Sequence, residues 1–332
     1  MSFIVPVRNA SDTLPDALAS LYKQTFTDFD ILVFNDGSTD GTAAALAEAT
    51  DRDRRVRVVG SERVGLVPAL RRLIDRSDSE LIARMDADDV CHPERLAEQV
   101  ALLDTRPGIQ LASALIHCFP DELVRGGMRR YETWLNSLVE PEEIARDIFV
   151  ESPICHPSVT MRREAYEATG GYVDDGNPED YGLWLRFFER GFEMAKVPRV
   201  LLEWRESAKR LTRIDERYEP RRFIALKIKH LFLGPLRDRH AISIWGAGQT
   251  GRMWGRVLKE AGIEVAAFVD IDPNKIGGTV QNAPVLSPDD LREGIPEGFL
   301  LAAVGAAGAR DLIRAFLADL DLRDPRDFLF VA

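Results

Sequence analysis

The chain has 332 residues, enough for about two domains, and its composition of 45% hydrophobic and 29% charged residues excludes extensive disorder. Its 43 basic and 54 acidic side chains give a net charge of −11, which argues against broad nucleic-acid binding because that binding needs a basic surface. The three cysteines are widely spaced without a Cys-x-x-Cys motif, so they predict neither a disulfide framework nor a structural zinc site. No apolar run reaches the roughly 20 residues of a membrane span, and the N-terminal run has no basic leader. We therefore expect a soluble, cytoplasmic protein.

Short apolar runs alternate with helical patterns over residues 2–108, which is typical of a parallel sheet covered by helices. Thr13 and Asp16 have the spacing of a capping box that opens an amphipathic helix, and Pro93 opens another. Ligands of such sheets bind beyond the carboxyl ends of the strands, so the residues after each strand are the candidates for a site. The predicted strands are residues 3–7, 31–34, 56–59 and 81–85.

The pattern becomes less regular after residue 108, with helical stretches predicted over 131–149 and 181–190. The next stretch is basic and helical, and we interpret it as a linker with a solvated face; contact with a membrane surface is the alternative. A fresh strand, a glycine-rich turn and a helix then predict a second, smaller α/β unit. The expected division is a first domain at 1–204, the basic linker at 205–239 and a Rossmann-like accessory domain at 240–332.

A cluster of acids directly follows the strand predicted at 81–85. Asp86, Asp88 and Asp89 would repel one another, and a divalent cation relieves such repulsion while it bridges to phosphate oxygens. The alternative is an acidic loop that interacts with the dipole of the helix after it. The spacing leaves both interpretations open.

Two further groups of polar residues have a functional and a structural interpretation. Asp36, after the second strand, could accept hydrogen bonds from a nucleobase, with Arg8 and Asn9 on the adjacent strand, or it could belong to a turn and helix cap. Asp180, just before an amphipathic helix, could be a general base or a helix-terminal acid. His156, beside a proline, could contact a donor or a metal, or it could be a packed loop histidine.

Taken in order, these segments resemble the inverting family 2 glycosyltransferases of GT-A fold, over about residues 2–205. The resemblance implies an α/β fold whose Rossmann-like mixed sheet carries helices on both faces, and a hexosyltransferase that moves a sugar from a nucleotide-diphosphate donor to an acceptor hydroxyl in surface polysaccharide or glycoconjugate synthesis. The matching segments are IVPVRNA at 4–10, NDGSTD at 35–40, MDADD at 85–89, PERL at 93–96, HPSV at 156–159, GGY at 170–172 and Glu179-Asp180.

The resemblance also implies roles for single residues. Asp86 and Asp88 would be the DXD pair that holds Mn²⁺ or Mg²⁺, with Asp88 nearest the metal. Asp180 would be the catalytic base, with Glu179 as the next candidate. Arg63 and Arg71 stand where many relatives carry asparagine, which is a departure from the family pattern. The implied donor-binding residues are Pro6, Arg8, Asn9, Asp36, Arg71, Asp86, Ala87, Asp88 and His156.

The implied partners are a nucleotide-diphospho-sugar, with UDP as the favoured nucleotide, and a saccharide or lipid-linked acceptor. A lipid-linked acceptor would bring the protein to the inner face of the membrane as a peripheral contact. Homo-oligomer formation is a further expectation, and nucleic acid is not an expected partner.

The C-terminal part resembles a truncated Rossmann nucleotide-binding module. Gly246, Gly248 and Gly251 lie between a strand and a helix, and Asp270 follows after about 20 residues. The unit is about half as long as a dinucleotide domain, so a packing or assembly module is favoured over NAD(P) binding. Two alternative functions remain open: an NAD(P)-dependent oxidoreductase acting on sugar nucleotides through this unit, and a catalytically silent sugar-nucleotide sensor.

Overall fold

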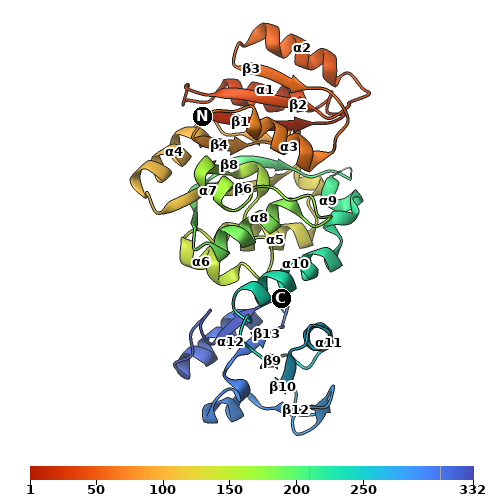
Figure 1. Ribbon diagram of the computed structural model, residues 1–332, viewed down its shortest axis with the longest axis vertical. Helices are drawn as coiled ribbons and strands as arrows, with labels where there is room; N and C mark the ends of the chain where they lie inside the picture. The colour runs from red at the N-terminus through yellow and green to blue at the C-terminus, as the bar shows by residue number, and fades with distance from the viewer. Residues whose placement is uncertain (209, 307) are drawn as a thin grey trace. The chain divides into compact units, whose positions relative to one another are not determined.

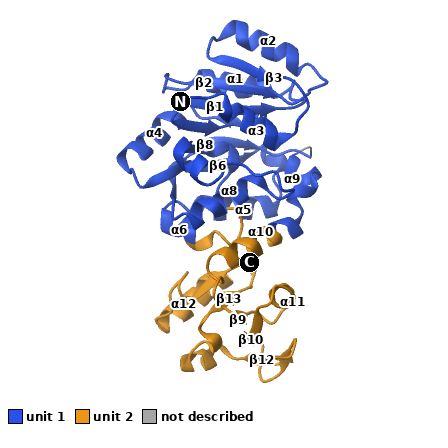
Figure 2. Ribbon diagram, viewed as in Figure 1, with its two compact units in different colours: residues 1–145, 153–223 blue, residues 146–152, 224–332 orange. Residues whose placement is uncertain are grey.

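The structure is a computed structural model that describes residues 1–208, 210–306 and 308–332. The chain forms two compact units (Figure 2). Residues 1–145 and 153–223 make up unit 1, and residues 146–152 and 224–332 make up unit 2. The domain boundaries expected from the sequence, at 204 and 239, stay a prediction.

The sheet of unit 1 has the strand order β3-β2-β1-β4-β7-β6-β8-β5. Figure 1 labels its strands β1 to β4, β6 and β8. Its first four strands pair in parallel, with β1 between β2 and β4. All residues of β1 are buried, because this apolar strand lies inside the sheet with both faces covered. The strands predicted here are confirmed to within one residue at each end: β1 (Ser2–Val7), β2 (Asp30–Asn35), β3 (Val56–Gly60) and β4 (Leu81–Arg84).

The other half of this sheet makes it mixed, as expected. β7 runs antiparallel to both β4 and β6, whereas β6 and β8 pair in parallel. β5 joins the edge antiparallel to β8. This arrangement brings the loop after β4 to the end of β8. The bounds are β5 (Val90–Cys91), β6 (Ile109–Phe119), β7 (Thr160–Arg162) and β8 (Glu193–Arg205).

The helices between residues 1 and 220 differ from the sequence prediction in two places. The capping box of Thr13 and Asp16 is wrong: the Thr13 side chain makes no cap hydrogen bond and instead donates to the Ala87 carbonyl at 3.1 Å. The helical stretch predicted at 131–149 is divided, and Pro141 starts its second part. The helices are α1 (Leu14–Tyr22), α2 (Thr42–Arg52), α3 (Leu66–Asp75), α4 (Arg95–Thr105), α5 (Gly126–Ser137), α6 (Pro141–Asp147), α7 (Arg163–Ala168), α8 (Glu179–Glu189) and α9 (Leu211–Ile214), with 3₁₀ turns η1 (Asp121–Leu123), η2 (His156–Ser158) and η3 (Glu216–Tyr218).

A buried arginine fixes the end of β4 inside unit 1. Arg95 is fully buried, and its Nη2 donates to the carbonyl oxygens of Arg84 at 2.8 Å and Val159 at 3.1 Å. Its Nε donates to Gln99 Oε1 at 3.2 Å. Because these bonds join α4 to β4 and to the segment after η2, the loop that follows β4 starts from a rigid position.

The basic run interpreted as a solvated linker is partly buried. β8 extends to Arg205, and the chain continues through α9, η3 and α10 (Pro220–Leu233). The side chain of Arg210 is only 8% exposed, so the solvated-face interpretation is wrong for this residue. The physical reason is its stacking on Trp204, with the guanidinium carbon 3.8 Å from the ring centroid.

Unit 2 contains the second, smaller α/β sheet that the sequence predicts, with the order β11-β12-β10-β9-β13-β14. Its strands are parallel except for β11. Among the described residues, no helix has both the length and the apolar character needed to cross a membrane. The elements are β9 (Ala241–Trp245), α11 (Gln249–Glu260), β10 (Glu264–Val269), β11 (Thr279–Val280), β12 (Ala283–Leu286), η4 (Pro288–Glu293), η5 (Pro296–Gly298), β13 (Leu300–Ala302), α12 (Ala309–Asp319) and β14 (Phe328–Phe330).

Candidate active site

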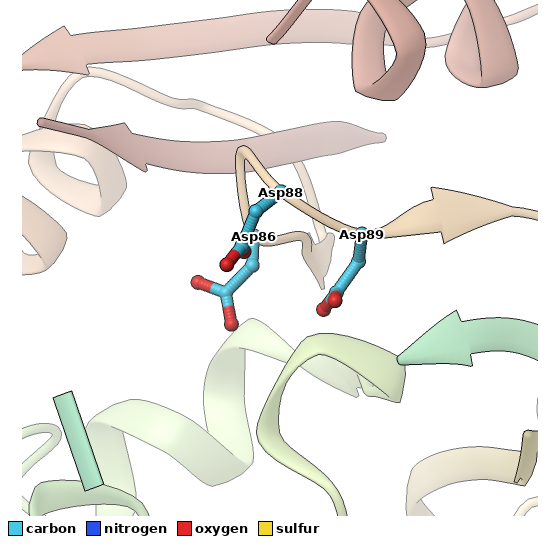
Figure 3. A group of neighbouring side chains, drawn as sticks. All are labelled: Asp86, Asp88 and Asp89. Atoms are coloured by element: carbon cyan, nitrogen blue, oxygen red, sulfur yellow. The ribbon is translucent and has the colours of Figure 1, made fainter. Parts of the chain in front are cut away.

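Three carboxylates converge in the loop after β4. Asp86, Asp88 and Asp89 each offer one oxygen, and these oxygens lie within 4.8 Å of one another. Figure 3 shows the three side chains on the same side of the loop. Carboxylate oxygens at this spacing are the ligands that Mg²⁺ and Mn²⁺ prefer.

The electrostatics of this cluster favour a cation. Burial and the charge of Asp86 raise the pKa of Asp88 to about 6, and the same two causes raise the pKa of Asp89 well above its usual range. Arg84 Nη1 lies 2.5 Å from Asp86 Oδ2 and compensates part of the negative charge. Asp89 Oδ2 is buried and has no hydrogen-bond partner in the described part of the chain. An orphaned carboxylate oxygen beside two others fits a divalent cation.

Two neighbouring elements hold the acidic loop in place. The Arg205 backbone N–H donates to Asp89 Oδ1 at 2.7 Å, and Arg205 Nε donates to the Asp88 carbonyl at 2.5 Å. From the other side, Thr13 at the start of α1 holds the Ala87 carbonyl. The carboxylates are therefore positioned before any ligand arrives.

Asp36 follows β2, and contacts within the protein already use most of the hydrogen-bonding capacity of its carboxylate. Its Oδ1 accepts hydrogen bonds from the backbone N–H groups of Val64 at 2.6 Å and Gly65 at 2.8 Å. Arg63 forms an ion pair with Oδ2, and its side chain remains 51% exposed. Gly37 has φ +62°, and a Cβ there would come within 2.7 Å of Arg63 Cβ. The close approach of the two loops thus places Arg63 in front of Asp36.

The residues after β1 shape the same edge of the sheet. Asn9 has φ +48°, its Oδ1 accepts from the Thr39 N–H at 2.9 Å, and its own N–H donates to Ser38 Oγ at 3.0 Å. These bonds join the ends of β1 and β2. Arg8 is exposed. Burial lowers the pKa of Arg63, and the positive charge of Arg8 lowers it further. Pro6, in contrast, is buried within β1.

The two acids at the start of α8 have different surroundings. Glu179 is buried, and Tyr218 Oη donates to both of its oxygens at 2.9 Å. His156 Nδ1 lies 3.6 Å and Arg217 Nη1 lies 3.5 Å from this carboxylate. Asp180 is half-buried, and burial together with Glu179 raises its pKa to about 7. Glu179 is thus held by the protein, whereas Asp180 has the pKa of a general base near neutral pH.

His156 lies in a buried network with Tyr172. Its Nε2 lies 2.6 Å from Tyr172 Oη, and burial, followed by the charge of Arg84, holds its pKa well below the usual range. Arg71 Nε donates to the Tyr172 carbonyl at 2.7 Å. His156 and Arg71 therefore support the wall around Glu179, and the packed loop histidine considered in the sequence is the arrangement observed. A role of either residue in donor binding stays a prediction.

Several residues near the acids were missed by the sequence reasoning. Arg84 is the clearest example, because its guanidinium forms an ion pair with Asp86. Burial and Glu179 raise the pKa of Asp180, and the charge of Arg84 acts in the opposite direction. A lone arginine inside an apolar strand was the signal available for it. The run interpreted as a linker contains three more such residues, Arg205, Arg210 and Tyr218. The sequence of this run does not show which of its side chains become buried.

The glycine-rich turn of unit 2 forms as the sequence pattern predicts. Gly246 has φ +114°, and a Cβ on Gly251 would lie 1.7 Å from the Gly246 carbonyl oxygen. Asp270 Oδ2 accepts from the Ala247 N–H at 2.8 Å and from Lys275 Nζ at 3.0 Å. A cavity of about 470 Å³ lies over this turn, and Gly246, Gly248 and Asp270 are among its lining residues. Asp270 itself is used to hold the turn.

Comparisons with known proteins bear on the part of the chain that carries these acids. Residues 2–170 match the family described as Glycosyl transferase family 2. The chain is 30% identical over 195 residues to the amylovoran biosynthesis glycosyltransferase AmsE of Erwinia amylovora, which covers 58% of this chain and 71% of that protein.

Two solved structures share the fold of this chain. One is S. aureus TarS 1–349 in complex with UDP-GlcNAc (TM-score 0.56, 16% identity, 70% of this chain and 66% of that one). The other is the mannosyltransferase PcManGT from Pyrobaculum calidifontis in complex with GDP-Man and Mn²⁺ (TM-score 0.51, 20% identity, 71% and 64%). The chain thus spans just under two thirds of either structure. The GT-A type fold expected from the sequence is confirmed.

Proposed function

The chain belongs to glycosyl transferase family 2 and is a glycosyltransferase, and from this premise we propose that it is a metal-dependent, inverting enzyme. The proposal is carried by the three carboxylates that converge after β4, one of which has a buried oxygen without a hydrogen-bond partner among the described residues. Arg84, which contacts Asp86 in this cluster, also lowers the pKa of Asp180. Burial and Glu179 outweigh this effect and raise the pKa of Asp180 to about 7. The first group suits a donor diphosphate with its cation, and the second suits an acceptor hydroxyl.

On the donor side, Asp86, Asp88 and Asp89 would hold Mn²⁺ or Mg²⁺. When bound, the cation supplies positive charge to the diphosphate as this group leaves the sugar. Arg84 and Arg205 keep the carboxylates in place. The presence of Mn²⁺ with GDP-Man in the Pyrobaculum mannosyltransferase supports this role.

We assign the base end of the donor to the edge formed by Asp36, Arg63 and Arg8. Arg63 offers guanidinium donors and Asp36 fixes them, so carbonyl oxygens of a uracil ring suit this position. The UDP-GlcNAc bound by TarS supports UDP as the nucleotide. Asn9 serves by shaping the loop.

On the acceptor side, Asp180 takes the proton of the attacking hydroxyl. The hydroxyl oxygen forms a bond to the anomeric carbon as the bond from this carbon to the diphosphate oxygen breaks, and the electron pair stays with the diphosphate. A single displacement inverts the anomeric configuration. Glu179 is engaged by Tyr218 and His156, so it positions the start of α8 rather than accepting the proton.

The acceptor belongs to polysaccharide or glycoconjugate synthesis in this proposal, supported by the biosynthetic role printed in the name of AmsE. A lipid-linked acceptor would bring the protein to a membrane surface as a peripheral contact. Sedimentation with vesicles that contain an anionic lipid tests this contact.

Self-association stays a prediction that sedimentation velocity tests. The family assignment favours transfer over the oxidoreductase and sensor alternatives.

The experiment that tests the function is transfer from a panel of UDP-sugars to saccharide acceptors. We expect product with Mn²⁺ and none after EDTA, and NMR coupling constants of the product should show the inverted anomer. Retained configuration, or equal turnover in EDTA, would contradict the proposal.

A further inference from the structure

A buried arginine after β8 has a guanidinium N–H group that makes no hydrogen bond with the described part of the chain. Arg210 precedes α9, its side chain is 8% exposed, and its guanidinium carbon lies 3.8 Å from the centroid of the Trp204 ring. Its Nη1 is buried without a hydrogen-bond partner among the described residues. It forms an ion pair with Glu206, whose Oε2 lies 3.6 Å from Nη1, a separation too long for a hydrogen bond.

Packing places the positive charge of this guanidinium near the acidic loop, because Arg210 stacks on Trp204 and the residue after this tryptophan, Arg205, donates to Asp89 Oδ1 and to the Asp88 carbonyl. The same charge lowers the pKa of Cys155, just before η2, against the larger effect of burial. Arg210 therefore lies near the acidic loop and near the segment that leads into η2.

The support around Arg210 explains why it stays in this position. β8 ends at Arg205, whose contacts hold the acidic loop, and the Glu206 N–H donates to the Phe119 carbonyl at 2.6 Å. Glu206 is 1% exposed, and its Oε1 lies 3.0 Å from Nη2 of Arg213. Glu206 thus forms ion pairs with both Arg213 and Arg210, the shorter with Arg213, and Trp204 is the flat support of Arg210.

A guanidinium N–H group that is buried without a hydrogen bond is costly, because it loses its hydrogen bond to water. A purely structural arginine would direct these groups to carbonyl or carboxylate oxygens, as Arg95 does. Stacking on an aromatic ring leaves the edge of the guanidinium, with its fork of donors, directed at a partner. Phosphate oxygens match this fork, and the donor proposed above brings them to this place.

We propose that Arg210, supported by Trp204, binds the diphosphate of the donor and stabilises the charge that this group gains on leaving. This inference rests on the proposed function, and it adds a residue that the family motifs quoted above do not contain. The cation held by the aspartates and the guanidinium of Arg210 would then share the leaving group. No proton is transferred by Arg210, because a guanidinium stays charged.

The test compares Arg210→Met with Arg213→Met in the full chain. Arg213 lies on the same segment, also contacts Glu206 and is 39% exposed, so it is a matched control for local disturbance. Calorimetry with Mn²⁺ measures the affinities for UDP and for UMP. Loss of a charged hydrogen-bond pair predicts that Arg210→Met weakens UDP binding by about 10- to 100-fold. UMP binding should change much less, and Arg213→Met should bind both like the wild type.

Two further variants separate diphosphate binding from folding. Arg210→Lys keeps the charge without the fork, so its UDP affinity should fall between the wild type and Arg210→Met. Trp204→Phe should keep more UDP affinity than Trp204→Ala. Thermal melts identify any variant that is not folded. The inference is overturned if folded Arg210→Met binds UDP like Arg213→Met, or loses UDP and UMP equally. If the wild type binds neither nucleotide and transfers no sugar, the proposed function fails as well.

Discussion

In each sheet, one strand is followed by a turn that contains aspartate: β4 in unit 1 and β10 in unit 2. The two sites differ in whether the protein itself satisfies the hydrogen-bonding capacity of these carboxylates. In unit 1, Asp88 and Asp89 repel a third carboxylate, Asp86, and Oδ2 of Asp89 is buried without a hydrogen-bond partner among residues 1–208, 210–306 and 308–332. In unit 2, Asp270 accepts from two backbone N–H groups and from Lys275. An acid with unused capacity is prepared for a ligand, whereas a satisfied acid stabilises its own turn. Similar positions in α/β units therefore do not imply similar roles.

The largest effect should come from the acidic loop. Asp88→Asn removes one charge from the cation site, and we expect the transfer rate to fall by about 10²- to 10³-fold, the scale for loss of a group that stabilises developing charge. Steady-state rates with saturating Mn²⁺ measure this. The matched change in unit 2, Asp270→Asn, should leave transfer within about twofold, since the proposed cation site lies in unit 1. Equal losses in both variants would remove the contrast between the two sites.

The acceptor side gives the next effect. Asp180→Asn should lower kcat by about 10²-fold or more, which is usual for the loss of a general base. Its affinity for UDP with Mn²⁺ should be unchanged, because Asp180 acts on the hydroxyl and not on the donor. Near-normal turnover would move the base to another residue, with Glu179→Gln as the next variant to measure.

The pH dependence tests the same residue in a different way. Burial and Glu179 raise the pKa of Asp180 to about 7, and the base must be deprotonated to accept a proton. We therefore expect kcat/KM to rise with pH up to about 7 and to level off above it. The residual activity of Asp180→Asn should lack this rise. A wild-type profile that is flat between pH 5 and 8 would exclude Asp180 as the titrating base.

The smallest effect on catalysis should come from the turn of unit 2. A Cβ at Gly251 would lie 1.7 Å from the Gly246 carbonyl oxygen, so Gly251→Ala should cost about 1–3 kcal/mol of unfolding free energy. A Cβ at Gly248 meets nothing within 4 Å, which makes Gly248→Ala the matched control. Chemical denaturation measures both. Both variants should bind UDP like the wild type, and a loss of UDP affinity in Gly251→Ala would contradict the separation of the two sites.

Much of this contrast could be predicted from the sequence. Apolar runs followed by acids located β1 to β4 and the loop with Asp86 and Asp88, because strand period and turn chemistry are local properties. The spacing from Gly246 to Asp270 located the turn of unit 2 for the same reason. Local pattern could not show that Thr13 contacts Ala87 instead of capping its helix.

The burial of basic residues was beyond sequence reasoning. Arg205 and Arg210 occur in a run whose charge predicts exposure, and their positions are decided by Trp204 and by the loop after β4. Whether Asp270 is free or satisfied was equally hidden, because Lys275 and the Ala247 N–H reach it only in the folded turn. Tertiary contacts therefore determine which of the two acidic sites remains available to a ligand.

Calorimetric titration of UDP into the full chain, with Mn²⁺ and with EDTA, tests most directly whether the acidic loop of unit 1 is a metal-dependent donor site. We expect UDP to bind with Mn²⁺, this binding to be lost in EDTA and in Asp88→Asn, and UDP to bind Asp270→Asn like the wild type. Binding of equal affinity in EDTA, or binding that depends on Asp270 and not on Asp88, would contradict this assignment.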